Sequence, residues 1–318
     1  MKRPSLLVLV ACAALCVAVQ SQTFISFKIG SDSTYPSGLN ASGEVVGMYY
    51  AGVYNSSYGF RRDATGTMHR LGEGVLPRVV NRRGEYAGLW NVSAFHQLPP
   101  GQHVLILKDK NSQALYLNDA GWLAGTCQCD GNNQPTESFV QDASGTLTIL
   151  QIPGAYESIF AGLNNANQLI GYYNTVENGP STGFLYVDGV VTPLNFPGAV
   201  SVYPKAINDS AEIVGVWVDA KGAGHAFYGT VAQGFTSFDV PGALQTSPWG
   251  INSSGTIVGS FFTSSQLLQG FMLKSGKFTT LNYPGAYQSV PLRVNNAGTV
   301  LGDWLTKKNL SRGFLWTP

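Results

Sequence analysis

The chain has few residues of the kinds that mark catalytic and metal sites. Its 318 residues include 4 cysteines, 4 histidines and 4 methionines, and charged residues make up 12% of the composition. Cys12 and Cys16 lie in an apolar N-terminal run that resembles a secretory signal. Without them, only Cys127 and Cys129 remain, and two cysteines do not make a disulfide framework. The sequence contains no Walker loop, dinucleotide-binding fingerprint, calcium-binding loop or His-Glu-x-x-His zinc motif. We therefore predict no metal ion, no cofactor and no catalytic residue.

The chain also lacks a marked excess of charge of either sign. It has 19 basic and 18 acidic residues, a formal net charge of +1, which does not point to nucleic acid or an anionic membrane as a partner. The local exception is the segment 61–110, which contains eight basic and four acidic residues. A solvated basic surface is the favoured interpretation, and an anion-binding patch is the alternative. The eight are Arg61, Arg62, Arg70, Arg78, Arg82, Arg83, Lys108 and Lys110.

No apolar run is long enough to span a membrane. The run at residues 6–19 is too short, follows Lys2 and Arg3, and ends in small and polar residues at Ser21, which is typical of a secretory signal. We expect residues 1–21 to be a signal peptide and residues 22–318 to form the mature domain. The expected product is a secreted monomer, extracellular or periplasmic, without a transmembrane segment.

The most informative feature of the chain is a repeat. Seven copies of an eight-residue pattern start with Asn and end with Gly, and their starting points are 37 to 46 residues apart. Asn at the first position of a type I turn caps it, and Gly at the fourth accommodates the left-handed backbone. Asn167 replaces this Gly in the fourth copy and can do the same, whereas Ala211 in the fifth is a departure. The copies begin at Asn40, Asn81, Asn118, Asn164, Asn208, Asn252 and Asn295.

Each repeat predicts four antiparallel strands. A strand with an interior glycine follows the turn, and a strand with Gly-Phe, Ala-Phe or Ser-Phe comes next. Proline recurs four residues before the Asn in five copies, as at Pro204, which favours an edge strand lining a central channel. The chain ends halfway through a repeat, while residues 24–30 resemble a fourth strand. These features predict an all-β, seven-bladed β-propeller whose N-terminal strand closes the last blade; a β-solenoid is the alternative.

The repeats resemble those of the extracellular HAF-repeat proteins. His225-Ala226-Phe227 matches the motif for which that family is named, and the resemblance runs from Gln22 to the C-terminus, most closely over residues 138–314. It implies secretion and a propeller-like fold. It implies no established reaction.

Two smaller groups of residues are open to a structural or a functional interpretation. Cys127 and Cys129 should point to one face of a strand, where a direct bridge would be strained, so an incidental thiol pair or a local disulfide is favoured over a metal site. His96 and His103 flank a Pro-Pro-Gly turn and are expected to face solvent. His225 belongs to the repeat and is expected to be structural.

The scarcity of acids, bases and nucleophiles favours a binding or scaffold module, secreted or surface-exposed, over an enzyme. The alternative is a carbohydrate-active lyase or hydrolase that uses Asp32 and Glu157 at the mouth of the channel, and a passive repeat protein without a ligand is a third possibility. Fold analogy cannot choose among them.

The predicted ligand site is a notch in the rim of the second repeat. Its Gly88-to-Phe95 segment is short, and Lys108-Asp109-Lys110 stands where other copies have Pro-Gly-Ala. We expect an anionic polymer or a carbohydrate to bind there, beside aromatic residues around the same mouth. The predicted ligand-binding residues are Lys108, Lys110, Tyr156, Trp249 and Tyr287.

Overall fold

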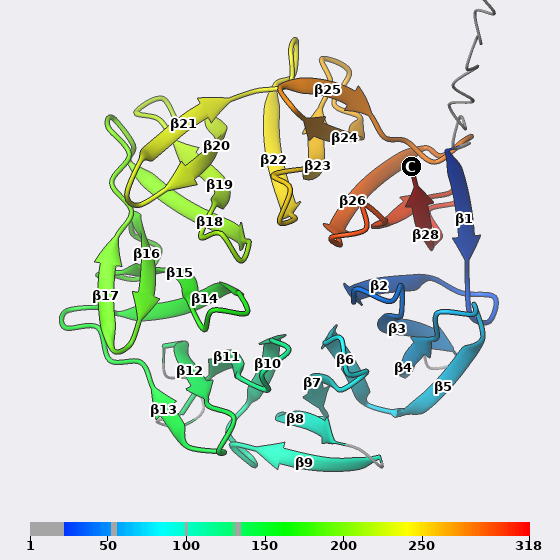
Figure 1. The fold of residues 1–318 in the computed structure, drawn as a ribbon, viewed down its shortest axis with the longest axis horizontal. Coiled ribbons are helices and arrows are strands. Elements are labelled where there is room, and N and C mark those ends of the chain that lie inside the picture. The colour runs from blue at the N-terminus through cyan, green and yellow to red at the C-terminus, as the bar shows by residue number, and fades with distance from the viewer. Residues whose placement is uncertain (1–21, 52–55, 99–100, 130, 132–134) are drawn as a thin grey trace, which may run out of the picture.

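The chain folds as the predicted seven-bladed β-propeller. The structure, a computed structural model, describes residues 22–51, 56–98, 101–129, 131 and 135–318, so the predicted signal peptide lies outside the described residues. Seven four-stranded antiparallel sheets surround a central axis (Figure 1). Within the described ranges, no helix is long and apolar enough to cross a membrane.

The strand that precedes each Asn turn is the innermost of its blade, as the recurrent prolines predict. It lies at one end of the sheet order, and its last residues line the central channel (Figure 1). The innermost strands are β2 (Thr34–Leu39), β6 (Val75–Val80), β10 (Ser112–Leu117), β14 (Glu157–Leu163), β18 (Ser201–Ile207), β22 (Gln245–Ile251) and β26 (Gln288–Val294).

The second strand of each blade carries the repeat glycine. A Cβ on Gly259 would lie 2.3 Å from the carbonyl oxygen of Ser247 and 2.7 Å from the Phe271 ring, so there is no room for a side chain. The second strands are β3 (Val45–Ala51), β7 (Tyr86–Trp90), β11 (Leu123–Cys127), β15 (Leu169–Asn174), β19 (Ile213–Val218), β23 (Ile257–Phe262) and β27 (Val300–Leu305).

The third strand places a phenylalanine directly opposite that glycine, as in the Gly259–Phe271 pair of β23 and β24. The seven phenylalanines, from Phe60 to Phe314, are among the largest fully buried side chains. The ring of Phe therefore occupies the space that the glycine leaves. The third strands are β4 (Ser56–Arg62), β8 (Ser93–Leu98), β12 (Glu137–Gln141), β16 (Ser181–Val187), β20 (Gly224–Thr230), β24 (Leu268–Lys274) and β28 (Ser311–Thr317).

The fourth strand is outermost, and in the last blade it comes from the N-terminus. Residues Thr23 to Phe27 pair with Thr317 to Gly313 of β28, so the predicted closure is confirmed (Figure 1). The fourth strands are β5 (Met68–Glu73), β9 (Gln102–Ile106), β13 (Leu147–Ile149), β17 (Val190–Pro193), β21 (Gly234–Phe238), β25 (Lys277–Thr280) and β1 (Thr23–Phe27).

The apolar core lies between neighbouring blades as well as within them. Val46 of the first blade, for example, packs with Val75, Val80 and Phe95 of the second. Burial of this kind stabilises by roughly 25 cal/mol per Å² of apolar surface. Each blade thus depends on its neighbours, and an unclosed ring would expose one such face.

The Asn turns have the predicted geometry. In the first, the amide N–H of Gly43 donates to the carbonyl of Asn40, and Gly43 has φ +86°. Asn167 and Ala211 both adopt φ 59°. Ala211 therefore departs from the repeat in residue type but keeps the left-handed conformation, at a cost of about 1–2 kcal/mol.

Candidate binding channel

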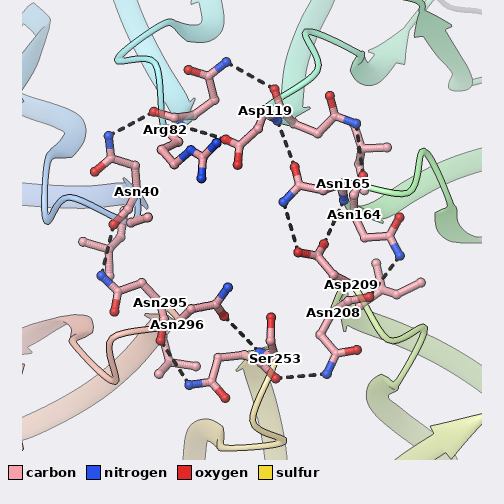
Figure 2. A pocket seen from close by; sticks show the side chains of 18 of the residues that line it. Asn40, Arg82, Asp119, Asn164, Asn165, Asn208, Asp209, Ser253, Asn295 and Asn296 are labelled. Carbon is pink, nitrogen blue, oxygen red and sulfur yellow. Dashed lines mark hydrogen bonds between the residues drawn. The ribbon is translucent and has the colours of Figure 1, made fainter.

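The seven turn asparagines form a closed ring of hydrogen bonds around one mouth of the channel (Figure 2). Asn40 Nδ2 donates to the backbone oxygen of Asn81 at 2.9 Å, and the same bond recurs from blade to blade until Asn295 donates back to Asn40 at 3.1 Å. The seven bonds measure 2.9–3.2 Å, and every asparagine is at most 9% exposed.

Each asparagine has a second function in its own turn. Asn252 Oδ1 accepts hydrogen bonds from the backbone N–H groups of Ser254 and Thr256, at 3.1 and 3.0 Å. One side chain therefore caps a turn with its oxygen and joins two blades with its nitrogen. The sequence predicts the first role alone.

Six of the seven residues that follow the turn asparagines form a second, incomplete ring. The backbone N–H of Asp119 donates to Asn165 Oδ1, and that of Asn165 donates to Asp209 Oδ1, both at 2.9 Å (Figure 2). Arg82 and Ser253 donate in the same way to the next blade. Because these polar groups already satisfy one another, this mouth, with a cavity of about 250 Å³, is primarily structural.

A collar of apolar side chains lies just inside the Asn ring. Each belongs to the residue immediately before the turn Asn, and each borders both the Asn-side cavity and a deeper one. Several of these side chains, such as those of Val80 and Ile207, pack in the apolar core between the blades. The collar residues are Leu39, Val80, Leu117, Leu163, Ile207, Ile251 and Val294.

A β-bulge occurs at the same place in every innermost strand, three residues before the Asn. In β18 the pairing with β19 passes from Pro204 to Ala206 and leaves Lys205 unpaired. Bulges redirect side chains. The bulged residues are Ser37, Arg78, Leu115, Ala161, Lys205, Trp249 and Leu292.

Several of these side chains line the deeper cavity, a chamber of about 220 Å³ that we call the cationic chamber. Its wall includes Arg78, Lys205 and Arg293, together with Tyr116 and Trp249, and contains no Asp or Glu. Among the residues that the structure describes, the ion pairs lie elsewhere, and no carboxylate is within ion-pair distance of these three cations.

The cations of the chamber have no acid beside them; Arg78 and Lys205 are half-buried, and Arg293 is exposed. Burial lowers the pKa of Lys205 and of Arg78, and Tyr50 partly opposes the shift at Arg78. The buried Nε of Arg78 has no hydrogen-bond partner among the described residues. Desolvated cations of this kind attract an anion more strongly than exposed ones.

Tyr116 supplies a neutral hydroxyl group beside these charges. Burial raises its pKa to about 12, and the opposing charge of Arg293 does not cancel that effect. Its phenol therefore stays protonated and can donate a hydrogen bond. Arg293 itself donates to the backbone oxygens of Leu292 and Trp249, at 3.0 and 3.4 Å, which holds its guanidinium group beside the chamber wall.

Aromatic rings accompany two of the cations. Lys205 Nζ lies 5.3 Å from the ring centre of Trp249 and 6.0 Å from that of Tyr203. Tyr203 packs edge-to-face on Tyr172, with ring centres 5.2 Å apart. Tyr50, which interacts with Arg78, makes the same contact with Tyr35 at 5.8 Å.

The structure places one predicted ligand-binding residue, Trp249, in the channel. Lys108 and Lys110 lie in the β9–β10 connection, and Tyr156 and Tyr287 lie in the connections that precede β14 and β26. The four therefore belong to three different interblade connections. Lys110 Nζ donates to the backbone oxygen of Cys129 at 3.0 Å, so one of the two notch cations is already engaged.

The short hairpin that underlies the notch prediction is present. Trp90 of β7 pairs with Ser93 of β8, so a two-residue turn joins the strands. Tyr156 and Tyr287 are 40% and 49% exposed, which leaves them accessible to a ligand. The notch stays a prediction.

The two carboxylates of the alternative enzyme hypothesis lie in different blades. Asp32 is in the connection from β1 to β2, where its backbone oxygen accepts a hydrogen bond from Arg312. Glu157 begins β14 and accepts a hydrogen bond from Asn174 at 2.7 Å. Neither belongs to the wall of the cationic chamber.

The prediction for His96 was wrong. Its side chain is 8% exposed, its Nε2 has no hydrogen-bond partner among the described residues, and it lies 3.9 Å from the buried carboxylate of Glu85. The predicted turn lies at residues outside the described ranges, but β8 places His96 inside the sheet. His103 is half-buried and packs against Trp90 and Phe95.

Cys127 and Cys129 form the local disulfide that was one of the favoured alternatives. The expectation that both cysteines lie on one strand was wrong, because β11 ends at Cys127 and Cys129 lies in a turn. Their Cα atoms are 5.1 Å apart, within the usual disulfide range. Glu137 lies beside them, and these three are the described residues that could together hold a metal ion once the disulfide is reduced.

Two of the eight basic residues in segment 61–110 form ion pairs with acids in the turns. Arg61 pairs with Glu44, and Arg83 pairs with Glu85 at 2.6 Å. Arg78 differs because it enters the channel. The sequence signal that could have found the chamber is the position three residues before each Asn, where charged and aromatic residues interrupt an otherwise regular pattern.

Comparison with solved structures agrees with the fold. The chain superposes on the β-propeller domain of the Trilobed protease from Pyrococcus furiosus with a TM-score of 0.64 and 12% identity, covering 89% of this chain and 95% of that one. It matches the acylaminoacyl peptidase of Pyrococcus horikoshii with a TM-score of 0.65 and 10% identity, over 90% of this chain and 51% of the peptidase. A prolyl endopeptidase structure matches with a TM-score of 0.58 and 10% identity, over 86% of this chain and 47% of that one.

These similarities establish the fold alone, since identity is 10–12%. The chain spans about half the length of the two latter peptidases. The Pyrococcus furiosus domain is described as having an open velcro topology, whereas here β1 completes the last blade. No protein-family model and no curated protein sequence matches the chain.

Proposed function

We propose that the protein is a binding module that holds an anionic ligand in the cationic chamber of its central channel. The observation that carries this proposal is the presence of Arg78, Lys205 and Arg293 on a chamber wall without Asp or Glu. Like charges gathered around one cavity without an acid repel one another, and Arg78 and Lys205 also lose part of their hydration, so a ligand that neutralises the three cations best explains their placement.

The proposal also covers the location of the protein. The signal-like residues 1–21 and the resemblance to HAF-repeat proteins support a secreted or surface-exposed monomer. Binding is favoured over catalysis because the chamber wall offers cations, a phenol and an indole but no carboxylate or histidine to act as general acid or base.

The chamber and the notch of the second repeat can be distinguished by titrating the protein with citrate in a calorimeter at low salt. We expect Arg78→Gln and Lys205→Gln each to weaken binding about tenfold, because a charge-assisted hydrogen bond contributes about 1.5–3 kcal/mol. Lys108→Glu/Lys110→Glu should leave the affinity unchanged. The reverse result would move the site to the notch, and no binding by the wild type would overturn an anion-binding function.

Binding should also depend on pH in a defined direction. Burial lowers the pKa of Lys205, so this ammonium loses its proton at a lower pH than an exposed lysine does. Arg78 and Arg293 keep their charge, and Tyr116 stays neutral up to a pH of about 12. Citrate affinity should therefore fall as the pH rises through the alkaline range in the wild type, and much less in Lys205→Gln.

A further inference from the structure

We propose that the ligand of the cationic chamber is the acidic end of a carbohydrate chain, held by its carboxylate and by the faces of its terminal sugar. This inference rests on the proposed function and specifies the class of ligand. It follows from three features of the channel: charges placed on separate blades, aromatic rings beside those charges, and an Asn-side end that a charged chain cannot pass.

The charges converge from different sides of the ring. Arg78 belongs to β6, Lys205 to β18 and Arg293 to β26, so the second, fifth and seventh blades each contribute one cation. A carboxylate between them accepts hydrogen bonds from more than one donor at once.

The aromatic rings set this chamber apart from a simple anion trap. The ammonium group of Lys205 lies 5.3 Å from the ring centre of Trp249, which belongs to the chamber wall, and 6.0 Å from that of Tyr203, which packs on Tyr172. Sugar rings present apolar C–H faces that pack on aromatic rings, while their hydroxyl groups exchange hydrogen bonds with phenols. An inorganic anion makes use of neither.

The geometry favours recognition of a chain end. The chamber of about 220 Å³ has room for roughly seven water molecules, which suits a single sugar residue. Beyond it lie the apolar collar residues and the Asn ring, whose side-chain amides are already hydrogen-bonded from blade to blade. A polyuronate therefore cannot continue through the channel, and the ligand enters from the mouth opposite the Asn turns.

The test is calorimetric titration with oligogalacturonates of one to four residues, their methyl esters, neutral oligosaccharides, citrate and sulfate. We expect the free acids to bind, the affinity to change less than threefold with chain length, and methyl esterification to weaken binding at least tenfold. Trp249→Leu should weaken binding of the uronates about tenfold and leave citrate binding within threefold. Lys277→Gln, an exposed lysine on β25, is the matched control and should change neither.

Each other outcome contradicts the inference in a recognisable way. Binding of citrate or sulfate without binding of uronates would overturn it while leaving the anion-binding function in place. Equal affinity for esters and acids would show that the carboxylate is not recognised. An affinity that grows steadily with chain length would indicate binding along a surface groove instead of recognition of the chain end. Thermal unfolding of every variant is measured alongside, and a Trp249→Leu protein that does not fold is replaced by Tyr203→Leu.

Discussion

At the scale of single residues, Ala211 shows how the turn imposes a conformation that its residue disfavours. Ala211→Gly removes the left-handed penalty of about 1–2 kcal/mol and adds unfolded-state entropy of roughly 0.4–1 kcal/mol. We therefore expect a net gain of about 0.5–1 kcal/mol in urea unfolding. The reciprocal control is Gly255→Ala, where an added Cβ meets no atom closer than 3.8 Å, so a comparable loss should be purely conformational. Shifts of the same sign in both variants would refute this account.

Asn252 joins two blades as well as capping a turn, and a near-isosteric change separates the roles. Asn252→Asp keeps the oxygen that accepts from Ser254 and Thr256 but replaces the donor to Asn295 by a carboxylate oxygen. We expect a loss of about 2–4 kcal/mol from the buried, unpaired acceptors. Ser253→Ala, next to it and exposed, should stay within about 0.5 kcal/mol. A midpoint for Asn252→Asp equal to that of the control would mean that the ring adds nothing to stability.

His96 gives the fold a sensitivity to acid. Burial lowers its pKa, although Glu85 opposes the shift, so in the window below the ordinary value the unfolded chain binds a proton that the folded chain does not. Stability is therefore complete above that window and falls as the pH drops through it. Urea midpoints measured from pH 7.5 to 5 should decline more steeply for the wild type than for His96→Gln. Parallel curves would show that His96 does not contribute.

At the scale of strands and turns, much was predictable because the repeat encodes local backbone chemistry seven times. Asn and Gly specify the turn, the strand glycine specifies a crowded position, and Pro204 and its equivalents specify an edge. The bulge at Lys205 was not predictable, because it depends on how β18 is registered against β19. The donor role of Asn252 was hidden for a similar reason: its partner lies 43 residues away and comes close only when the ring closes.

The strand glycines make a prediction at this scale. An added Cβ on Gly259 meets the backbone oxygen of Ser247 at 2.3 Å, and backbone cannot move aside without breaking the sheet. Gly259→Ala should cost about 3 kcal/mol or more. Gly72→Ala in the outer strand β5, where the nearest atom is 3.5 Å away, should cost little. Equal denaturant midpoints for the two variants would show that the backbone around Gly259 can move to accommodate a side chain.

At the scale of the whole molecule, several contacts join the last blade to the first, and two of them can be removed separately. One is β1, whose Phe27 ring fills the space over Gly313 and whose Ser26 accepts a hydrogen bond from Trp304. The other is the hydrogen bond from Asn295 to Asn40 at the channel mouth. The first carries apolar burial and a strand ladder, whereas the second carries one buried polar contact.

Because β1 supplies the strand pairing and much of the apolar burial at this closure, its removal should lower the stability more than any single substitution. Deleting residues 22–30 takes away Phe27 and Ile29, both buried, and leaves the backbone of β28 as an open edge. Compared with a chain that begins at Gln22, the shortened protein should unfold at a markedly lower temperature and form oligomers that grow with concentration in gel filtration. Asn295→Asp, which removes the second contact alone, should lower the unfolding temperature less and stay monomeric. A shortened protein that melts and elutes like the chain from Gln22 would show that the seven blades hold together without the N-terminal strand.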